Sequence, residues 1–421
     1  MFFKLLKDAL KVKNVRNKIL FTIFIIFVFR VGTHVTVPGI NAESLKQLSD
    51  LPFLNMLNLV SGNAMNNFSI FSMGVSPYIT ASIIVQLLQM DIYPKFVEWG
   101  KQGEVGRRKL NQATRYITLV LAFVQSIGIT ASFNTLSSIS LVKTPNVSTY
   151  LLIGTILTAG SIIVTWLGEQ ITDKGFGNGV SMIIFSGIIA SIPKMFSTIY
   201  EDFFVNVRSG ELTRSYIIVA LLIVVGLAIV FFTTFVQQAE YQIPIQYTKL
   251  VQGAPTSSYL PLKVNPAGVI PVIFASSITT IPSTILPFFS KVTWLSHLQG
   301  LLSYNTPSGM ITYAILIILF SFFYTFVQVN PEKTAENLQK NGSYIPSVRP
   351  GRETEKYMSS LLKRLATIGA VFLAFISLAP IAAQQFMHLT SSIALGGTSL
   401  LILISTGIEG MKQLEGYLLK R

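Results

Sequence analysis

Long apolar runs recur along the whole sequence, and each is close to the length that a helix needs to cross a bilayer. A hydrocarbon core of roughly 30 Å takes about 20 apolar residues in a helix. The runs are continuous and do not alternate between apolar and polar residues, so they favour helices over the strands of a barrel. The sequence therefore predicts an all-α membrane protein with ten transmembrane helices, at residues 19–35, 68–90, 116–136, 150–168, 180–195, 216–236, 267–289, 311–329, 365–386 and 398–413.

The composition supports a membrane protein. Hydrophobic residues make up 51% of the 421 residues and charged residues only 12%, about half the charged share of a soluble domain. A chain this apolar cannot cover its surface with polar groups in water. Basic residues precede the first run, as they do in a secretory signal. No small-residue cleavage site follows that run, so we expect a retained first helix.

The basic residues are unevenly divided between the two sides of the predicted bundle, and the net charge is +14. When the N-terminus is placed in the cytoplasm, most Lys and Arg residues fall on the cytoplasmic side, as the positive-inside rule requires. The exceptions are Arg30, Lys46, Lys143, Lys194, Arg208, Arg214 and Lys291. We therefore expect both termini in the cytoplasm, and the positive charge does not by itself indicate nucleic-acid binding.

Ten spans divide into two halves of five, which enter the membrane in opposite orientations. Such a division is typical of inverted-topology repeats, although the sequence shows no clear internal repeat. The expected parts are a basic N-terminus (1–18), an N-terminal half (19–198), an external connector (199–215), a C-terminal half (216–413) with cytoplasmic loops 237–263 and 330–363, and a cytoplasmic tail (414–421).

The segment 53–67, between the first two predicted spans, is too short to cross a bilayer and too apolar for a free loop. Its apolar residues are Phe53, Leu54, Met56, Leu57, Leu59 and Val60. A re-entrant half-helix fits this pattern. An amphipathic helix on the outer membrane surface fits equally well.

Ionisable residues are sparse in the predicted spans, and none of Asp, Glu, Lys or Arg lies between Arg364 and Glu409. The chain has no cysteine and its three histidines are far apart, so we expect no metal site. The Gly-rich strings 103–106 and 175–179 follow no strand, so they indicate tight cytoplasmic turns and not phosphate loops.

Three classes of function compete for a chain of this kind. An ion-coupled transporter would normally need ionisable groups or broken helices at the membrane midplane, although a sodium site built from carbonyl groups would escape notice. An intramembrane enzyme would need clustered carboxylates, a Ser/His pair or a metal site at membrane depth. A passive channel needs none of these groups, so we favour a channel and expect no enzymatic activity.

Short strings along nearly the whole chain resemble the SecY family of protein-translocation channels. They occur in the family's order: VPGI (37–40), PYITASII (77–84), GE (103–104), GRRK (106–109), WLGEQIT (166–172), GNG (177–179), PLKVN (261–265), AGVIP (267–271), RPG (349–351) and GGTSLL (396–401). The resemblance implies an hourglass pore between two inverted five-helix halves. It also implies a bacterial cytoplasmic membrane and a chain that passes secretory proteins across it and releases membrane helices sideways into it.

The resemblance further implies a ring of aliphatic side chains at the waist of the pore. Carried over by motif, its members are Val75, Ile79, Val180, Ile184, Ile273 and Ile402. Two of the helices contribute pairs four residues apart, which stack on one helix face. Such pairs are also common packing residues in membrane helices, so the resemblance, and not the spacing, carries this assignment.

Two further features of the family carry over to this sequence. The segment 53–67 falls where the family has its plug. The second and seventh spans resemble the two sides of the lateral gate, with Thr80 and Asn265 as candidate polar contacts across it. Either residue could equally be an ordinary packing contact between membrane helices.

The large cytoplasmic loops resemble the family's docking surface for the ribosome and the SecA motor. Candidate docking residues are Arg107, Arg108, Lys249, Arg349 and Arg352, and Arg349 matches an arginine that the family uses for motor function. Positive-inside topology alone would also make these loops basic. Loop 237–263 carries only two lysines where many relatives have several arginines, which puts its ribosome contact in doubt. The implied partners also include the small subunits SecE and SecG, signal sequences, nascent chains and membrane lipids. The resemblance implies no cofactor and no small-molecule substrate.

Overall fold

The computed structural model describes residues 9–41, 58, 61–62, 64–136, 141–205, 212–247, 257–285, 306–387 and 396–419. Within these residues, a helix overlaps each of the ten predicted spans. The helices are α2 (Lys13–Gly32), α5 (Ser76–Leu87), α7 (Gly103–Leu136), α8 (Val147–Lys174), α9 (Gly179–Tyr200), α10 (Leu212–Gln238), α11 (Ile270–Ile285), α13 (Pro307–Gln328), α15 (Arg352–Met387) and α17 (Gly396–Leu419).

Six helical segments are long and apolar enough to cross a membrane, judged by length and composition. They are Gly103–Asn134, Val147–Lys174, Gly179–Val205, Ser215–Gln238, Pro307–Lys340 and Arg352–Ala383. The window in Ser215–Gln238 is the most apolar of the six and is only 6% buried inside the protein. A helix that is apolar on all sides and uncovered by protein is stable only in lipid, so the chain is a multi-pass membrane protein.

Polar side chains at the helix starts explain why several helices begin where they do. The side chain of Asn178 accepts a hydrogen bond from the backbone N–H of Ser181 at the start of α9 (3.2 Å). Thr306 does the same for Gly309 at the start of α13 (3.1 Å). These caps satisfy N–H groups that have no partner within the helix.

The second predicted span, 68–90, is helical over only part of its length. Residues 68–75 are irregular, and Gly74 has a φ of 52°, in the left-handed region that favours glycine. The hydroxyl of Ser161 in α8 donates to the carbonyl of Gly74 (3.0 Å). After this segment comes α5, which continues as the π-helix η2 (Leu88–Ile92). Non-helical backbone at membrane depth is tolerated where protein buries it in this way.

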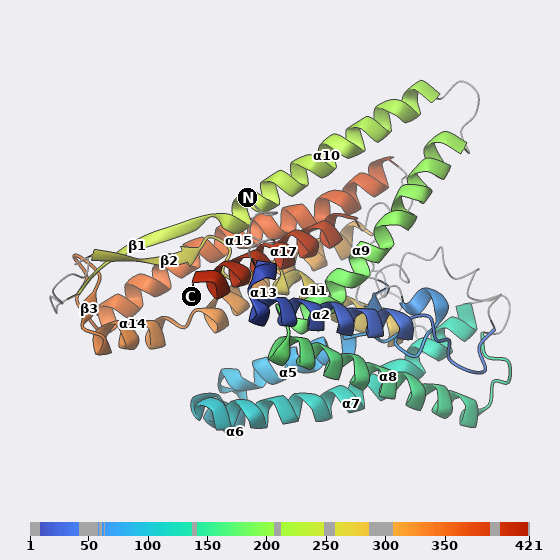
Figure 1. Ribbon diagram of the computed structural model, residues 1–421, viewed down its shortest axis with the longest axis horizontal. Coiled ribbons are helices and arrows are strands. Elements are labelled where there is room, and N and C mark those ends of the chain that lie inside the picture. The colour runs from blue at the N-terminus through green and yellow to red at the C-terminus, as the bar shows by residue number, and fades with distance from the viewer. Residues whose placement is uncertain are drawn as a thin grey trace.

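The helices form two groups that meet at the centre of the molecule. In the first group α7 packs on α5 and α8, and α8 also packs on α2 and α9. In the second, α13 packs on α11 and α15, and α17 packs on α10 and α15. Figure 1 shows α5, α7 and α8 along the bottom and α10 and α15 along the top. The groups contact each other where α11 packs on α5 and α7 and where α17 packs on α9.

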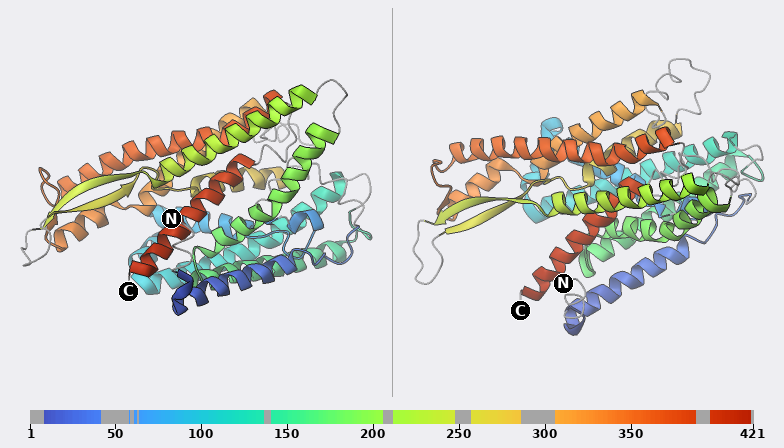
Figure 2. Two further views of the ribbon diagram at one scale, coloured as in Figure 1. Left: turned by 45° about the horizontal axis from the view of Figure 1, so that its top comes forward. Right: turned by 90° about the horizontal axis from the view of Figure 1, so that it is seen from above.

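A small sheet stands at one end of the bundle, where the sequence predicted only loops. Strand β1 (Glu240–Tyr247) pairs antiparallel with β2 (Ser257–Lys263) and with the short β3 (Ser343–Tyr344), in the order β2-β1-β3. Ile243 on β1 is fully buried in a cluster that includes Met358 of α15. Figure 2 shows the sheet at one end of the molecule in both views. Helices α6 (Pro94–Lys101) and α14 (Pro331–Lys340) lie at the same end (Figure 1).

The two Gly-rich strings differ in structure. The string 175–179 is a tight turn between α8 and α9, as predicted, and Gly177 has a φ of 86°. The string 103–106 is not wholly a turn, because α7 already begins at Gly103. Gly106 therefore lies inside a helix, where a Cβ would sit 1.8 Å from the backbone oxygen of Trp99 in α6.

Candidate functional site

All six predicted ring residues lie in a single apolar cluster at the centre of the molecule. They come from the residue before α5, from α5 itself and from α9, α11 and α17. Val75, Ile79, Ile184 and Ile402 are buried, and Val180 and Ile273 are partly buried and pack against the same cluster. Four helices from both groups therefore converge on one largely apolar centre, and the six ring side chains offer no hydrogen bond to water.

The polar residues around this centre are uncharged. Among the described residues, the buried polar side chains are all Ser, Thr, Asn or Gln. Buried hydroxyls commonly donate to the carbonyl four residues earlier in the same helix, as Thr165 does to Ser161 (2.9 Å). Within the same part of the chain, no three His, Asp or Glu side chains are grouped closely enough to hold a metal ion.

The two predicted gate residues are buried and each makes a local hydrogen bond. The hydroxyl of Thr80 donates to the carbonyl of Ser76 within α5 (3.2 Å). The side-chain amide of Asn265, just before α11, donates to the carbonyl of Gly268 (2.9 Å). Helices α5 and α11 do pack on each other, but neither of these hydrogen bonds crosses between them.

The six predicted apolar plug residues, Phe53, Leu54, Met56, Leu57, Leu59 and Val60, lie outside the described residues. Within the predicted plug, the structure describes residues 58, 61–62 and 64–67, and the name 58–67 segment refers to these residues alone. It ends in the 3-10 helix η1 (Ala64–Asn67).

The described residues of the 58–67 segment are buried or partly buried inside the protein. Asn58, Ser61, Ala64 and Met65 are all buried. The side-chain amide of Asn58 donates to Oδ1 of Asn66 (2.6 Å), and the backbone N–H of Asn66 donates to Oδ1 of Asn58 (3.1 Å). These burial values favour a re-entrant segment over a surface helix for this part of the chain.

Arg30, which the charge distribution assigns only to the outer side, contacts the 58–67 segment. It lies in the last turn of α2 and is half-buried. Its Nη1 donates to the carbonyl of Gly62 (2.8 Å), and its Nη2 donates to the carbonyl of Ser186 in α9. One feature of the sequence does point to Arg30: it is the single charged residue inside the predicted span 19–35. A charged residue inside a membrane span is a functional candidate by default.

The predicted docking residues lie on exposed surface at the end that carries the sheet. Arg349 and Arg352 flank the start of α15, and Arg107 and Arg108 lie near the start of α7; all four are exposed. Lys249 lies outside the described residues. Neither Arg349 nor Arg352 has a side-chain hydrogen bond or ion pair with the described part of the chain, so both guanidinium groups are available to a partner.

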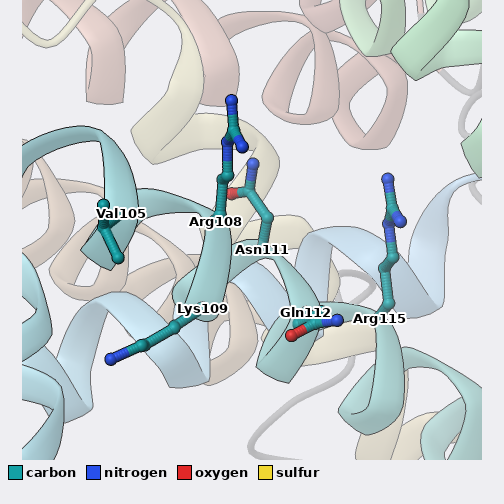
Figure 3. Close-up of a pocket in the computed structure, with 6 residues that line it drawn as sticks. All are labelled: Val105, Arg108, Lys109, Asn111, Gln112 and Arg115. Atoms are coloured by element: carbon teal, nitrogen blue, oxygen red, sulfur yellow. The ribbon is translucent and has the colours of Figure 1, made fainter.

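A surface pocket of about 480 Å³ runs along α7 and is lined by Val105, Arg108, Lys109, Asn111, Gln112 and Arg115. In Figure 3, Arg108, Asn111 and Arg115 point to one side and Lys109 points away. Lys109 lies 5.9 Å from the ring centre of Trp99 in α6, and Arg115 pairs with Glu169 in α8. All six lining residues are exposed and none belongs to the central cluster, so the pocket lies on the outside of the helix bundle.

The fold and the apolar centre define a multi-pass helical membrane protein whose two helix groups close on each other. The family model described as SecY matches residues 69–411. A protein translocase subunit SecY from Streptococcus sanguinis (strain SK36) is 72% identical over 425 residues, covering 100% of this chain and 98% of that protein. One from Bacillus subtilis (strain 168) is 50% identical over 423 residues, covering 100% and 98%. The chain therefore belongs to the SecY family.

Solved structures share the fold at low sequence identity. A protein conducting channel matches with a TM-score of 0.66 at 16% identity, covering 95% of this chain and 92% of that chain. Sec61 from a canine ribosome-channel complex matches with a TM-score of 0.63 at 16% identity, with the same coverage. At this level of identity the likeness concerns the fold alone.

Proposed function

We propose that this chain is the pore-forming subunit of a protein-translocation channel in the bacterial cytoplasmic membrane. The observation that carries the proposal is the 72% identity, over the whole chain, to a relative described as a protein translocase subunit. The channel passes unfolded secretory chains across the membrane and releases apolar helices sideways into lipid. It is a passive pore, and the energy comes from the SecA motor or from ribosomal synthesis.

The buried cluster that holds Val75, Ile79 and Ile184 suits the waist of such a pore. An aliphatic constriction without polar groups loses its water when no chain is present and so blocks ions. The same methyl groups offer no preferred hydrogen bond, so they do not select among the side chains that pass. The ring can widen around any of them. A polar waist would hold water and would also select among substrates.

The packing of α5 against α11 supports a lateral exit between the two helix groups. Thr80 lies on α5 and Asn265 lies just before α11, and their hydrogen bonds stay within their own segments. No polar bond between these two residues would then have to break when the helices separate. An apolar signal sequence that enters between α5 and α11 could form apolar contacts with both helices in place of the contacts that they lose with each other.

The positions of the basic loops support termini in the cytoplasm and a docking surface there. The charge distribution assigns the loop that leads into α7 and the loop 330–363 to the cytoplasm, and both lie at the end that carries the sheet (Figure 1). Arg107, Arg108, Arg349 and Arg352 are exposed at this end. They would bind ribosomal RNA through phosphates, with an affinity that falls as salt rises, or acidic side chains of SecA.

Reconstituted vesicles test the proposed function. They would contain this chain with SecE and SecG, and SecA, ATP and an unfolded secretory precursor would be added outside. We expect ATP-dependent protection of the precursor from protease. If the precursor stays accessible while an ion gradient drives uptake of a small solute, the chain is a transporter and the proposal is wrong.

A further inference from the structure

Arg30 is a cation at the end of a membrane helix whose two recorded hydrogen bonds both go to backbone carbonyls. The acceptors belong to Gly62 in the 58–67 segment and Ser186 in α9. No carboxylate of the described residues forms an ion pair with it. A lone charge inside a predicted membrane span is costly unless polar groups surround it, so these two carbonyls supply the surroundings that keep Arg30 in place.

The backbone around these acceptors is unusually close-packed. A Cβ built on Gly187, the residue after Ser186, would lie 2.4 Å from the Cα of Gly62. A Cβ built on Gly62 would lie 3.0 Å from the ring of Phe29, next to Arg30 in the chain, and Gly62 has a φ of 68°. Two glycines thus let the segment reach α9, and the guanidinium group joins the two backbones at that contact.

Moving the 58–67 segment away from α9 would separate the two acceptors of Arg30. The guanidinium group would keep at most one of them, and its freed donors would stay unpaired until water reached them. Hydrogen bonds from a charged donor are roughly twice as strong as neutral ones, and an unpaired buried donor is more costly still. Arg30 therefore favours the arrangement in which the segment is held inside the protein.

We propose that Arg30 is a positioning residue that holds the 58–67 segment against α9 and so keeps the idle channel closed to ions. This inference rests on the proposed function, in which the segment belongs to the plug. Arg30 acts through the segment and touches no translocating chain. When the segment moves out, the water that enters can solvate the guanidinium group, so the hold is reversible.

The test measures resting ion conductance in planar bilayers of the channel assembled with SecE and SecG. Arg30→Met removes the donors at similar side-chain length, and we expect a several-fold rise in resting conductance. Arg30→Lys keeps the charge but lacks the guanidinium fork that reaches two acceptors, so we expect an intermediate rise. Lys194→Met is the matched control: it removes an exposed cation from α9 and should leave the conductance unchanged.

A second variant keeps the charge and disturbs only the contact. Gly187→Ala places a methyl carbon only 2.4 Å from the Cα of Gly62, so it should push the segment away and also raise the resting conductance. This variant decides the question if Arg30→Met fails to assemble. If both variants assemble and their resting ion conductance equals that of the parent, the proposed role of Arg30 is wrong.

The same preparations separate this inference from the proposed function. Translocation driven by SecA and ATP is measured on the unaltered chain alongside the conductance of the variants. If the unaltered chain translocates and the variants do not leak, only the role of Arg30 fails. If the unaltered chain translocates nothing, the proposed function fails, and the role of Arg30 in closing a protein channel fails with it.

Discussion

Arg115 in α7 and Glu169 in α8 form an ion pair with two parallel hydrogen bonds. The Nε of Arg115 lies 3.0 Å from Oε1 of Glu169, and its Nη2 lies 2.6 Å from Oε2. The side chains are 59% and 22% exposed, respectively. Glu169 belongs to the string 166–172 that resembles the SecY family, so one physical role of that string is to join two neighbouring helices.

Glu169→Gln should weaken this helix contact only slightly, because water screens an exposed pair. We expect a loss of about 0.5–1 kcal/mol in the free energy of unfolding, near the upper end for exposed pairs because the geometry is bidentate. Unfolding in detergent would measure it, with Arg115→Gln and the double variant completing a cycle. A coupling of about 3 kcal/mol or more would mean that the pair behaves as a buried one.

The apolar runs predicted where helices lie but not where some of them begin. α7 begins at Gly103 and α15 at Arg352, several turns before the predicted spans 116–136 and 365–386. Hydropathy detects only the part of a helix that suits lipid. The polar turns before it are helical because they pack on α6 and α14, and such contacts are not visible in the run itself.

The charge of loop 237–263 gives no indication of the sheet, but its pattern of apolar residues does. Its first part alternates, with Ile243 and Ile245 buried between exposed neighbours, which is the period-two signal of a strand. The pairing places Ile243 opposite Leu260 on β2. The partners of Ile243 in the cluster come from β2 and from the distant α15, so the stability of this strand depends on contacts that a local pattern cannot supply.

The site could be predicted to different extents. The ring positions came from the resemblance, and the structure brings Ile79, Ile184 and Ile402 into one cluster; their role in a pore stays a prediction. The contacts of Arg30 could not be predicted, because its acceptors are backbone carbonyls at residues 62 and 186. Every residue has a carbonyl group, so a carbonyl acceptor leaves no mark in the sequence.

Gly160→Ala should destabilise the protein strongly. A Cβ on Gly160 in α8 would lie 1.8 Å from the carbonyl oxygen of Ile70, and backbone cannot move aside as a side chain can. We expect a loss of about 1–3 kcal/mol or more from this overpacking, measured by thermal unfolding in detergent. Gly226→Ala in α10 is the control, because nothing lies within 4 Å of its Cβ. Equal stability of the two variants would contradict the close backbone contact.

Arg349→Glu should abolish ATP-driven translocation while leaving folding and membrane insertion unchanged. Its guanidinium group is exposed and unpaired among the described residues, so reversing its charge removes a docking contact without breaking an internal one. Lys356→Glu is the matched control, because Lys356 is exposed nearby but already pairs with Glu353 (3.0 Å). Equal losses from both variants, or none from Arg349→Glu, would indicate bulk loop charge and not a specific contact.

The ring gives the sharpest prediction, because its proposed function depends on apolar character and not on any one side chain. Changing Ile79 and Ile184 together to Asn keeps roughly the same volume but lines the waist with groups that hold water. A hydrophobic gate closes by losing water, so hydration should raise the resting conductance several-fold in planar bilayers. Ile→Val at both positions should cost about 0.5–1.5 kcal/mol of stability per site and open no path.

The matched control is the pair Ile153 and Leu157 in α8, which are aliphatic and buried as Ile79 and Ile184 are, but belong to a different cluster. Changing both to Asn should reduce stability at least as much, since each amide is buried without a designed partner. It should open no path for ions, because this cluster is not the one that holds the ring. If the channel that carries both Ile79→Asn and Ile184→Asn assembles and shows the same resting ion conductance as the parent, the constriction is formed by other residues. In that case the assignment of the ring to this cluster is wrong.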